Sequence, residues 1–361
     1  MNSDLLQQLD TKLGATEVPG ISGIVLGDIT ETVTAGNSLR LHVALGARSP
    51  MLQAQLKHDL AQILTQLGVS ADVDFSISVP EAKPSPEAKT GNLAQVKNIV
   101  AVASGKGGVG KSTTAVNLAL ALAADGASVG MLDADIYGPS QPHMLGVGSE
   151  RPVINSPSSV EPIEVHGLKL ISMGSLVTEK TPMVWRGPMA SSALQQLMHN
   201  TNWGELDYLI VDMPPGTGDI QLTLSQSVAL SGAVIVTTPQ DIALLDAKKG
   251  VEMFTKVDVP VLGVVENMST HICSNCGHTE AIFGEEGGER LAEQYGVSLL
   301  GRLPLTMAIR AQTDSGLPPV AAEPASNVAA EYFSIARKLA ASIWQLSLAG
   351  NTGPLISITD D

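Results

Sequence analysis

A glycine-rich loop between two apolar segments constrains the fold of this chain more than any other feature. The loop follows a β-branched run at 99–103 and precedes an Ala/Leu-rich segment at 114–124, the order expected of a strand, a loop and a helix. Four loop residues satisfy the phosphate-binding pattern G-x-x-x-x-G-K-[ST]: Gly105, Gly110, Lys111 and Ser112. Glycines let main-chain N–H groups converge on phosphate oxygens, and the helix that follows adds the positive end of its dipole. The sequence therefore predicts a nucleotide site in an α/β fold.

The polar side chains of this loop have separate expected roles. We expect Lys111 to reach the β- and γ-phosphates of the nucleotide and Ser112 to bind Mg²⁺ through its hydroxyl. Lys106 places a second cation within the loop, which by itself indicates only added positive charge at the same site. The complete expected phosphate loop consists of Gly105, Lys106, Gly107, Gly108, Val109, Gly110, Lys111, Ser112 and Thr113.

Aspartates follow two further apolar runs of the chain. Asp133 and Asp135 come directly after the run 128–132. Asp212 ends the run 207–211 and is followed by a loop rich in proline and glycine. Because ligands gather at the carboxyl ends of parallel strands, we expect Asp135 and Asp212 to position Mg²⁺ or the attacking water. The alternative for the first two aspartates is a helix cap or a turn.

An asparagine and two cysteines follow a later strand, which is expected at 259–265. Asn267 has an amide that can donate and accept at an adenine edge, whereas the ordinary role of such an asparagine is a cap or a turn. Cys273 and Cys276 are the only cysteines of the chain. Their C-x-x-C spacing lets two thiolates hold one metal ion or one iron of a cluster.

One chain supplies only half of the thiolates that such a site usually takes. Cysteine-bound clusters and thiolate zinc sites commonly use four, and a symmetric dimer with this loop on the twofold axis would supply four. The spacing leaves other interpretations open. They are a Cys₂His₂ zinc site completed by His271 and His278, a redox dithiol, and an inert pair.

The charge of the chain limits its partners. The net charge of −15 disfavours binding to nucleic acid or to an anionic membrane surface, because both need a basic face. The first residues lack the basic and apolar regions of a signal peptide, and no uncharged apolar run reaches about 18 residues. Two cysteines are too few for a disulfide scaffold. We therefore expect a cytoplasmic protein that binds neither nucleic acid nor membrane.

The pattern of apolar residues divides the chain into two domains. The first contains expected helices at 5–13 and 51–67 and expected strands at 21–26, 39–45 and 71–79. His42 alternates with apolar neighbours in one of these strands, so a structural role is expected for it. The second alternates strands and helices, which predicts a mostly parallel sheet, with a turn-rich stretch at 136–190 and a last helix at 327–346. The expected divisions are a small α+β domain at 1–79, a proline-containing linker at 80–96, a large α/β domain at 97–346 and an acidic tail at 347–361.

Six motifs occur in an order that resembles the Mrp/ApbC family of iron–sulfur cluster carrier ATPases, a class of P-loop ATPases with a deviant Walker A motif. They are SGKGGVGKST (104–113), LDADIYGPS (132–140), VWRGPM (184–189), VDMPPGTGDIQLT (211–223), TTPQDIALLDAKKG (237–250) and ENMSTHICSNCGH (266–278). The resemblance implies a homodimer that hydrolyses ATP slowly and holds a bridging [4Fe-4S] cluster. It also implies that scaffold proteins supply the cluster and that apoproteins receive it.

The resemblance assigns roles to single residues. It makes Lys106 the lysine that reaches the partner's phosphates, Asp135 the water-positioning switch carboxylate and Asp212 the second switch carboxylate. It makes Asn267 the adenine reader and places the cluster on the cysteine pair.

The six motifs cover nearly all of residues 97–345, and the N-terminal domain separately resembles a degenerate MIP18-like domain without a D-P-E-L-type motif and without cysteine. An ATPase with a structural zinc site is one alternative. A positioning or partitioning ATPase is another, and it would need a basic face or a basic amphipathic tail.

Overall fold

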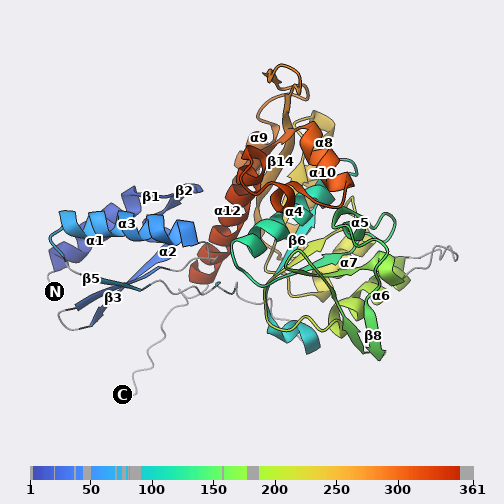
Figure 1. Cartoon of the computed structure of the whole chain (residues 1–361), viewed down its shortest axis with the longest axis horizontal. Coiled ribbons are helices and arrows are strands. Elements are labelled where there is room, and N and C mark those ends of the chain that lie inside the picture. Colours follow the sequence, from blue (N-terminus) through green and yellow to red (C-terminus); the bar gives the residue numbers. More distant parts are fainter. Residues whose placement is uncertain are drawn as a thin grey trace.

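The computed structural model describes residues 3–19, 21–35, 38–43, 50–69, 71–74, 79, 81, 91–156, 158–176 and 187–349. Its centre is a nine-stranded sheet in the order β10-β11-β7-β12-β6-β13-β14-β15, with β16 also paired to β14 (Figure 1). The strands are β6 (Val96–Ala103), β7 (Val129–Asp133), β10 (Ile163–Val165), β11 (Leu168–Ser172), β12 (Leu206–Asp212), β13 (Gly232–Thr237), β14 (Val261–Ile272), β15 (Thr279–Glu280) and β16 (Leu299–Leu305). Only the β10–β11 and β14–β15 pairs of this sheet are antiparallel. The expected α/β fold with a mostly parallel sheet is confirmed.

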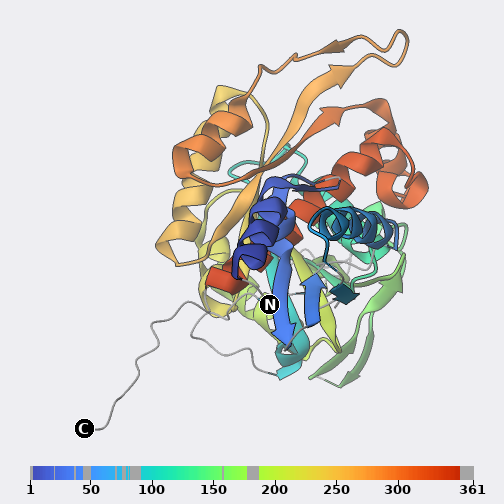
Figure 2. The same cartoon turned by 90° about the vertical axis from the view of Figure 1, so that its left-hand side faces the viewer.

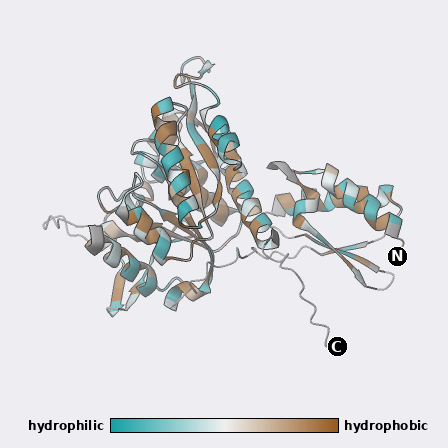
Figure 3. Ribbon diagram, turned by 180° about the vertical axis from the view of Figure 1, so that it is seen from behind, coloured by the Kyte–Doolittle hydropathy of each residue, from teal (hydrophilic) through white to brown (hydrophobic). Residues whose placement is uncertain are grey.

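Helices cover both faces of this sheet because its strands are apolar on both sides. On β6, Val100 and Val102 face a core cluster shared with α4 (Lys111–Ala124) and α12 (Asn327–Ala349). Ile99 and Ala101 face the opposite cluster. That second cluster is shared with α6 (Gly187–Asn200), α7 (Asp219–Ser227), α8 (Asp241–Lys256) and α9 (Gly287–Tyr295). Figure 3 shows the apolar strands in brown between these helices. Helix α4 is buried along most of its length, as its apolar sequence predicts.

Shorter elements complete the large domain. They are η1 (Gly91–Gln95), α5 (Gln141–Met144), β8 (Val153–Ser156), β9 (Ser159–Glu161), η2 (Met173–Leu176), α10 (Met307–Asp314) and α11 (Pro319–Ala322). Strands β8 and β9 form a separate antiparallel hairpin. None of the helices in the described part of the chain has the length and apolar content that crossing a membrane would need.

The N-terminal domain is a small α+β unit that packs on the last helix of the large domain (Figures 1 and 2). Its elements are α1 (Ser3–Ala15), β1 (Glu17–Val18), β2 (Ile21–Val25), α2 (Leu26–Ile29), β3 (Thr30–Ala35), β4 (Ser38–Val43), α3 (Pro50–Gln66) and β5 (Ala71–Asp74). Leu41 and Leu56 are among the buried leucines of its core, and Trp344 of α12 packs against this cluster. The small domain therefore completes its core with a helix from the far end of the chain.

The structure corrects several expected boundaries. Strand β3 was not predicted from the sequence. Its residues are Thr-Glu-Thr-Val-Thr-Ala, with one large apolar side chain, and none of the positions whose burial is described is fully buried. Strand β5 ends at Asp74, and residues 75–78 of the expected strand lie outside the described residues. The turn-rich stretch at 136–190 contains α5, β8 to β11 and the start of α6.

Both ends of the large domain also extend further than expected. The last residues of the expected linker are folded, because Leu93 of η1 is buried in the core and Val96 begins β6. Helix α12 continues to Ala349, so the expected tail begins as a helical turn. The proline-rich part of the linker at 82–90, the motif residues 184–186 and the tail at 350–361 lie outside the described residues.

Strand β14 continues well beyond its expected end at residue 265. It reaches Ile272, so Asn267 lies within the strand rather than after it. The strand was expected to end where polar residues begin. Two of these residues are buried, however, since Glu266 and Asn267 are only 1% and 8% exposed. Glu266 accepts a hydrogen bond from the main-chain N–H of Gly288 in α9, which explains how a carboxylate is accommodated there.

Candidate functional site

The glycine loop borders a cavity of about 220 Å³ at the carboxyl end of β6 and the start of α4. Its lining includes Lys106, Lys111, Ser112 and Thr113 from the loop and Asp135 from the turn after β7. The structure therefore brings the predicted phosphate loop and one predicted carboxylate to one site. A cavity of this kind, with main-chain N–H groups and lysines around it, suits the phosphates of a nucleotide.

Two glycines of the loop are required by close approaches. A side chain at Gly105 would overlap the main chain of Asp246 in α8. Gly110 has a φ of +82°, and a side chain there would overlap the amide of Asn267. Both positions exclude other residues for steric reasons, so the pattern of glycines reflects packing as well as phosphate binding.

Lys111 forms a buried ion pair with Asp212 at the end of β12. Its ammonium also donates to the hydroxyl of Ser112, with 3.1 Å between nitrogen and oxygen. Asp212 is completely buried, and its second oxygen accepts a hydrogen bond from Gln141 Nε2 at 2.7 Å. The predicted carboxylate thus lies behind Lys111, beneath the cavity rather than in its lining.

Asp133 lies beside Asp212 in the sheet, because the β7–β12 register pairs the two residues. It accepts hydrogen bonds from the main-chain N–H groups of Ser140 and Gln141 at 3.0 and 3.1 Å and from the Ser172 hydroxyl at 3.0 Å. Burial, and secondarily the charge of Asp212, raises the pKa of Asp133 to about 7. Asp133 therefore organises the turn that leads into α5.

Asp135 has the turn role that the sequence left open for it, and it also lies at the cavity. Its Oδ1 accepts hydrogen bonds from the N–H groups of Tyr137 and Gly138, both at 3.2 Å, so it stabilises a turn. It also lines the cavity. A role in positioning water or Mg²⁺ remains a prediction that this placement permits.

Asn267 contacts the glycine loop directly. Its Nδ2 donates a hydrogen bond to the main-chain oxygen of Val109 at 2.8 Å. The side chain therefore supports the loop from β14, a contact between residues far apart in sequence. Its predicted contact with adenine stays a prediction.

The cysteine pair occupies the loop of the hairpin formed by β14 and β15. Cys273 N–H donates to the carbonyl of His278 and Gly277 N–H donates to the carbonyl of Cys273, both at 2.9 Å. The main-chain N–H groups of Cys276 and then Asn275 hydrogen-bond the Cys273 sulfur and hold the pKa of that thiol below its usual value. Both cysteines are free, and Cys276 is exposed.

This hairpin stands away from the body of the sheet, at the top of Figure 1. His271 faces Glu280 across the hairpin, with 3.8 Å between Nδ1 and Oε1. Among the described residues, no group of three or more His, Cys, Asp or Glu side chains is arranged to hold a metal ion. The single chain thus presents two thiols, and the Cys₂His₂ set considered from the sequence is not assembled in it.

Four residues at the site were given no role from the sequence, although Ser140 and Pro215 lie within two of the quoted motifs. Met144, Ser140 and Pro215 line the cavity, and Gln141 binds Asp212 beneath it. These contacts arise from turns whose path is set by the tertiary structure, so local patterns do not reveal them.

A family model described as the NUBPL iron-transfer P-loop NTPase matches residues 95–340. The chain belongs to this family. Members of this family are P-loop NTPases, in agreement with the cavity and the glycine loop described above.

Similar proteins with curated names support the same assignment. The iron-sulfur cluster carrier protein of Pseudomonas fragi is 62% identical over 268 residues, which are 74% of this chain and 93% of that protein. The iron-sulfur cluster carrier protein of Escherichia coli K12 is 55% identical over 292 residues, covering 81% of this chain and 79% of that protein. A mitochondrial iron-sulfur protein required for NADH dehydrogenase in Arabidopsis thaliana is 51% identical over 255 residues, covering 70% of this chain and 81% of that protein.

Solved structures show the same fold. A nucleotide-binding protein of Archaeoglobus fulgidus, determined in complex with ADP, matches with a TM-score of 0.56 and 36% identity, covering 62% of this chain and 88% of that one. The cell division ATPase MinD of Pyrococcus furiosus matches with a TM-score of 0.51 and 23% identity, covering 67% of this chain and 97% of that one. The second match shows the fold alone.

Proposed function

We propose that this protein hydrolyses ATP and carries a [4Fe-4S] cluster, which Cys273 and Cys276 of two copies hold between them and which is delivered to apoproteins. The observation that carries the proposal is the hairpin loop with two free thiols, one of them activated by main-chain N–H groups. Such N–H groups stabilise the thiolate, which is the form that binds iron. The names of the similar proteins support iron–sulfur cargo.

A dimer is proposed because the loop supplies two of the four thiolates that a [4Fe-4S] cluster takes. The loop stands away from the rest of the sheet, so a second copy can bring an identical loop to it without displacing the core (Figure 1). A twofold axis through the hairpin would place four equivalent sulfurs around one cluster.

The nucleotide half of the proposal uses the cavity at the glycine loop. Main-chain N–H groups of the loop and Lys111 bind the phosphates of ATP, and Lys106 reaches the phosphates held by the partner subunit. Asp135 positions the attacking water at the cavity wall, and Asn267 contacts adenine. In this proposal Lys106 can contact the phosphates of the other subunit only when the dimer has formed.

The oxygen donors at the cavity fit Mg²⁺, because the Ser112 hydroxyl and the Asp135 carboxylate both line it and Mg²⁺ prefers oxygen ligands. When bound, Mg²⁺ neutralises charge on the phosphates. Ser112 would hold the ion, and Asp135 and Asp212 would orient its surroundings.

Strand β14 connects the two halves of the proposed function. Asn267 of this strand contacts the glycine loop, and Cys273 follows the strand's last residue. We infer that ATP binding and hydrolysis change the geometry of the cysteine loop through this strand and thereby control loading or release of the cluster.

Scaffold proteins are the proposed donors and apo iron–sulfur proteins the proposed recipients. The proposed setting is the cytoplasm, where thiols remain reduced.

Cluster transfer tests this function directly. The protein is loaded anaerobically with iron and sulfide, separated from free iron and mixed with an apo-enzyme whose activity requires a [4Fe-4S] cluster. We expect the wild type to restore activity with ATP present, Cys273→Ser/Cys276→Ser to restore none and Lys111→Ala to transfer at an altered rate. Zinc in place of iron at the cysteines, or transfer by the cysteine variant, would contradict the proposal.

A further inference from the structure

Gln141 lies between two buried carboxylates at the nucleotide site. It is the first residue of the four-residue helix α5 and is completely buried. Its main-chain N–H donates to Asp133 Oδ2 at 3.1 Å, and its side-chain Nε2 donates to Asp212 Oδ2 at 2.7 Å. The same Nε2 donates to the main-chain oxygen of Ser112 at 3.0 Å. Gln141 thereby joins the ends of β7 and β12 to the start of α4.

Asp212 shares its two oxygens between Gln141 and Lys111. The ammonium of Lys111 binds Oδ1, and the Gln141 amide binds Oδ2. A buried carboxylate that loses its partners is strongly destabilised. For Lys111 to bind phosphate, its ammonium must leave or share Asp212, and the amide of Gln141 is then the neutral donor that still holds the carboxylate.

The orientation of the Gln141 amide is fixed by this contact. Its Oε1 is buried and has no hydrogen-bond partner among the described residues. Exchanging the amide nitrogen and oxygen would set Oε1 against the Asp212 carboxylate, where two acceptors repel. A buried acceptor without a partner is unfavourable. The amide nevertheless keeps this orientation, because its hydrogen bond to the Asp212 carboxylate stabilises the protein more than the unpartnered Oε1 destabilises it. The neighbouring Ser140 hydroxyl is likewise buried without a partner among the described residues, and it lies at the cavity wall.

We propose that Gln141 is a positioning residue that makes Lys111 available to the nucleotide phosphates by keeping Asp212 hydrogen-bonded when the lysine leaves. This role rests on the proposed function, because it requires the cavity to bind a nucleotide. It concerns only the exchange of Lys111 between a carboxylate and a phosphate. The other charged groups around the network are Asp133 at the end of β7, Asp135 in the turn after it and Lys106 in the glycine loop.

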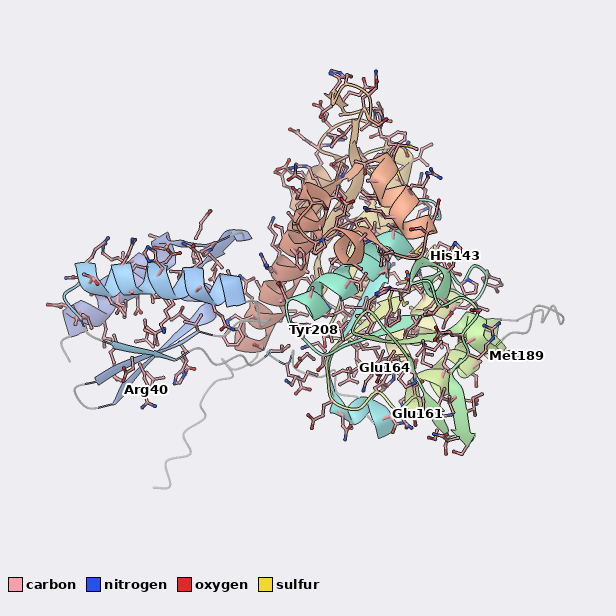
Figure 4. The ribbon with its side chains drawn as sticks, in the orientation of Figure 1. Arg40, His143, Glu161, Glu164, Met189 and Tyr208 are labelled. Carbon is pink, nitrogen blue, oxygen red and sulfur yellow. The ribbon has the colours of Figure 1, made fainter. Side chains whose placement is uncertain are left out.

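The test is ADP affinity measured by titration calorimetry in EDTA, so that no metal ion contributes. Gln141→Met keeps the length of the side chain and removes the amide. We expect it to bind ADP about tenfold more weakly, the effect of one hydrogen bond to a charged group. In an Asp212→Asn background, Lys111 has no carboxylate to leave, so Gln141→Met should cause no further loss. His143, labelled in Figure 4, lies exposed on the same helix, and His143→Ala should bind ADP like the wild type.

Two results would overturn this role. One is unchanged ADP affinity in Gln141→Met. The other is an equal loss in the wild-type and Asp212→Asn backgrounds, which is what a merely structural role produces. Gln141→Leu serves as a second variant if Gln141→Met does not fold, as judged by circular dichroism. Because no iron is present, failure of cluster transfer would leave this result standing, whereas absence of ADP binding by the wild type would overturn the nucleotide site and this role together.

Discussion

The side-chain amide of Asn267 donates a hydrogen bond to the main-chain oxygen of Val109, with 2.8 Å between nitrogen and oxygen. A strand residue thus supports the phosphate loop at Gly110, where a side chain would be strained by the φ of +82° and would overlap the Asn267 amide. The same strand ends at Ile272, next to the first cysteine. The nucleotide loop and the cysteine loop are therefore joined by one strand, whose pairing with β16 shifts register between Asn267 and His271 and whose Met268 has a φ of +57°.

Replacing Asn267 should uncouple these two loops. We expect ADP or ATP to change the alkylation rate of the wild-type thiols at least about fivefold, the lower range of typical coupling between sites. Asn267→Ala should abolish this response because β14 no longer contacts the glycine loop. Alkylation is followed by mass spectrometry on metal-free protein at saturating nucleotide. Asn155→Ala, on the exposed β8–β9 hairpin, is the matched control and should respond like the wild type. A full nucleotide response in Asn267→Ala would exclude β14 as the connection.

Replacing Lys111 should affect both stability and hydrolysis. Lys111→Ala leaves Asp212 buried without its cationic partner, which should cost about 3 kcal/mol in the free energy of unfolding. It should also lower ATP hydrolysis at least about a hundredfold, because charge on the phosphates is no longer stabilised. Urea unfolding and phosphate release are the measurements.

Two further variants separate these effects of Lys111. Lys111→Ala/Asp212→Asn should recover stability without recovering hydrolysis. Lys97→Ala, which breaks the half-exposed pair between Lys97 and Asp207, should change stability by at most about 1 kcal/mol. Equal destabilisation by Lys97→Ala and Lys111→Ala would contradict the importance given to the buried pair.

The stability of the protein should depend on the proton of Asp133. Its pKa is raised from 3.8 to about 7 in the folded protein, so the folded state holds this proton more tightly than the unfolded chain. The contribution of Asp133 to the free energy of unfolding therefore falls as the pH rises from about 4 to about 7, by a few kcal/mol in total. Urea unfolding at several pH values measures the slope. Asp133→Asn should lose this fall, whereas Asp314→Asn, which changes an exposed aspartate of α10, should keep it. Parallel slopes in all three proteins would show that Asp133 ionises normally.

Gly105 and Gly107 should differ sharply in their tolerance of alanine. Gly105→Ala forces the loop away from the main chain of Asp246 and should cost about 1–3 kcal/mol as well as weaken ADP binding. Gly107→Ala meets only the Pro215 side chain at 4.0 Å and should retain the stability of the wild type. Thermal unfolding and ADP titration of both variants make the comparison. Equal stabilities would mean that α8 does not pack against the loop as described.

Cys273 should react as a thiolate at lower pH than an ordinary cysteine. The N–H groups of Cys276 and Asn275 lower its pKa, and both are main-chain groups that Cys276→Ser retains. In that single-cysteine variant, the pH midpoint of alkylation should lie below the usual value of 9.0 and return to it in denaturant. A midpoint that is the same in the folded and denatured protein would contradict the activating role of the loop.

The sequence was sufficient to predict the parts of the site that local patterns specify. The glycine loop, the strand ends at Asp133 and Asp212, and the cysteine spacing each lie within a few residues of chain. The meeting of the glycine loop with the two strand ends at one edge follows from the parallel sheet, which the alternation of strands and helices predicts. The small domain was predicted less completely because β3 is mostly polar and gains its order by pairing with β4.

Contacts between distant segments could not be predicted in the same way. Gln141 and Asp212 are 71 residues apart, and their hydrogen bond depends on the β7–β12 register and on the turn that precedes α5. Asn267 was predicted to leave its strand, but β14 continues to Ile272, and the side chains of Asn267 and Ser269 donate hydrogen bonds to the main-chain oxygens of Val109 and Leu303. In both cases the side chain makes a tertiary hydrogen bond that periodicity does not predict, and the motif around Asn267 indicated only a contact with adenine.

Native mass spectrometry of the protein after anaerobic reconstitution with iron and sulfide tests directly whether two copies share one cluster. We expect a dimer that carries one cluster of four irons and four sulfides, and a Cys273→Ser/Cys276→Ser variant that carries none. A monomer that holds its own metal, a dimer that holds zinc, or a cluster retained by the cysteine variant would contradict it.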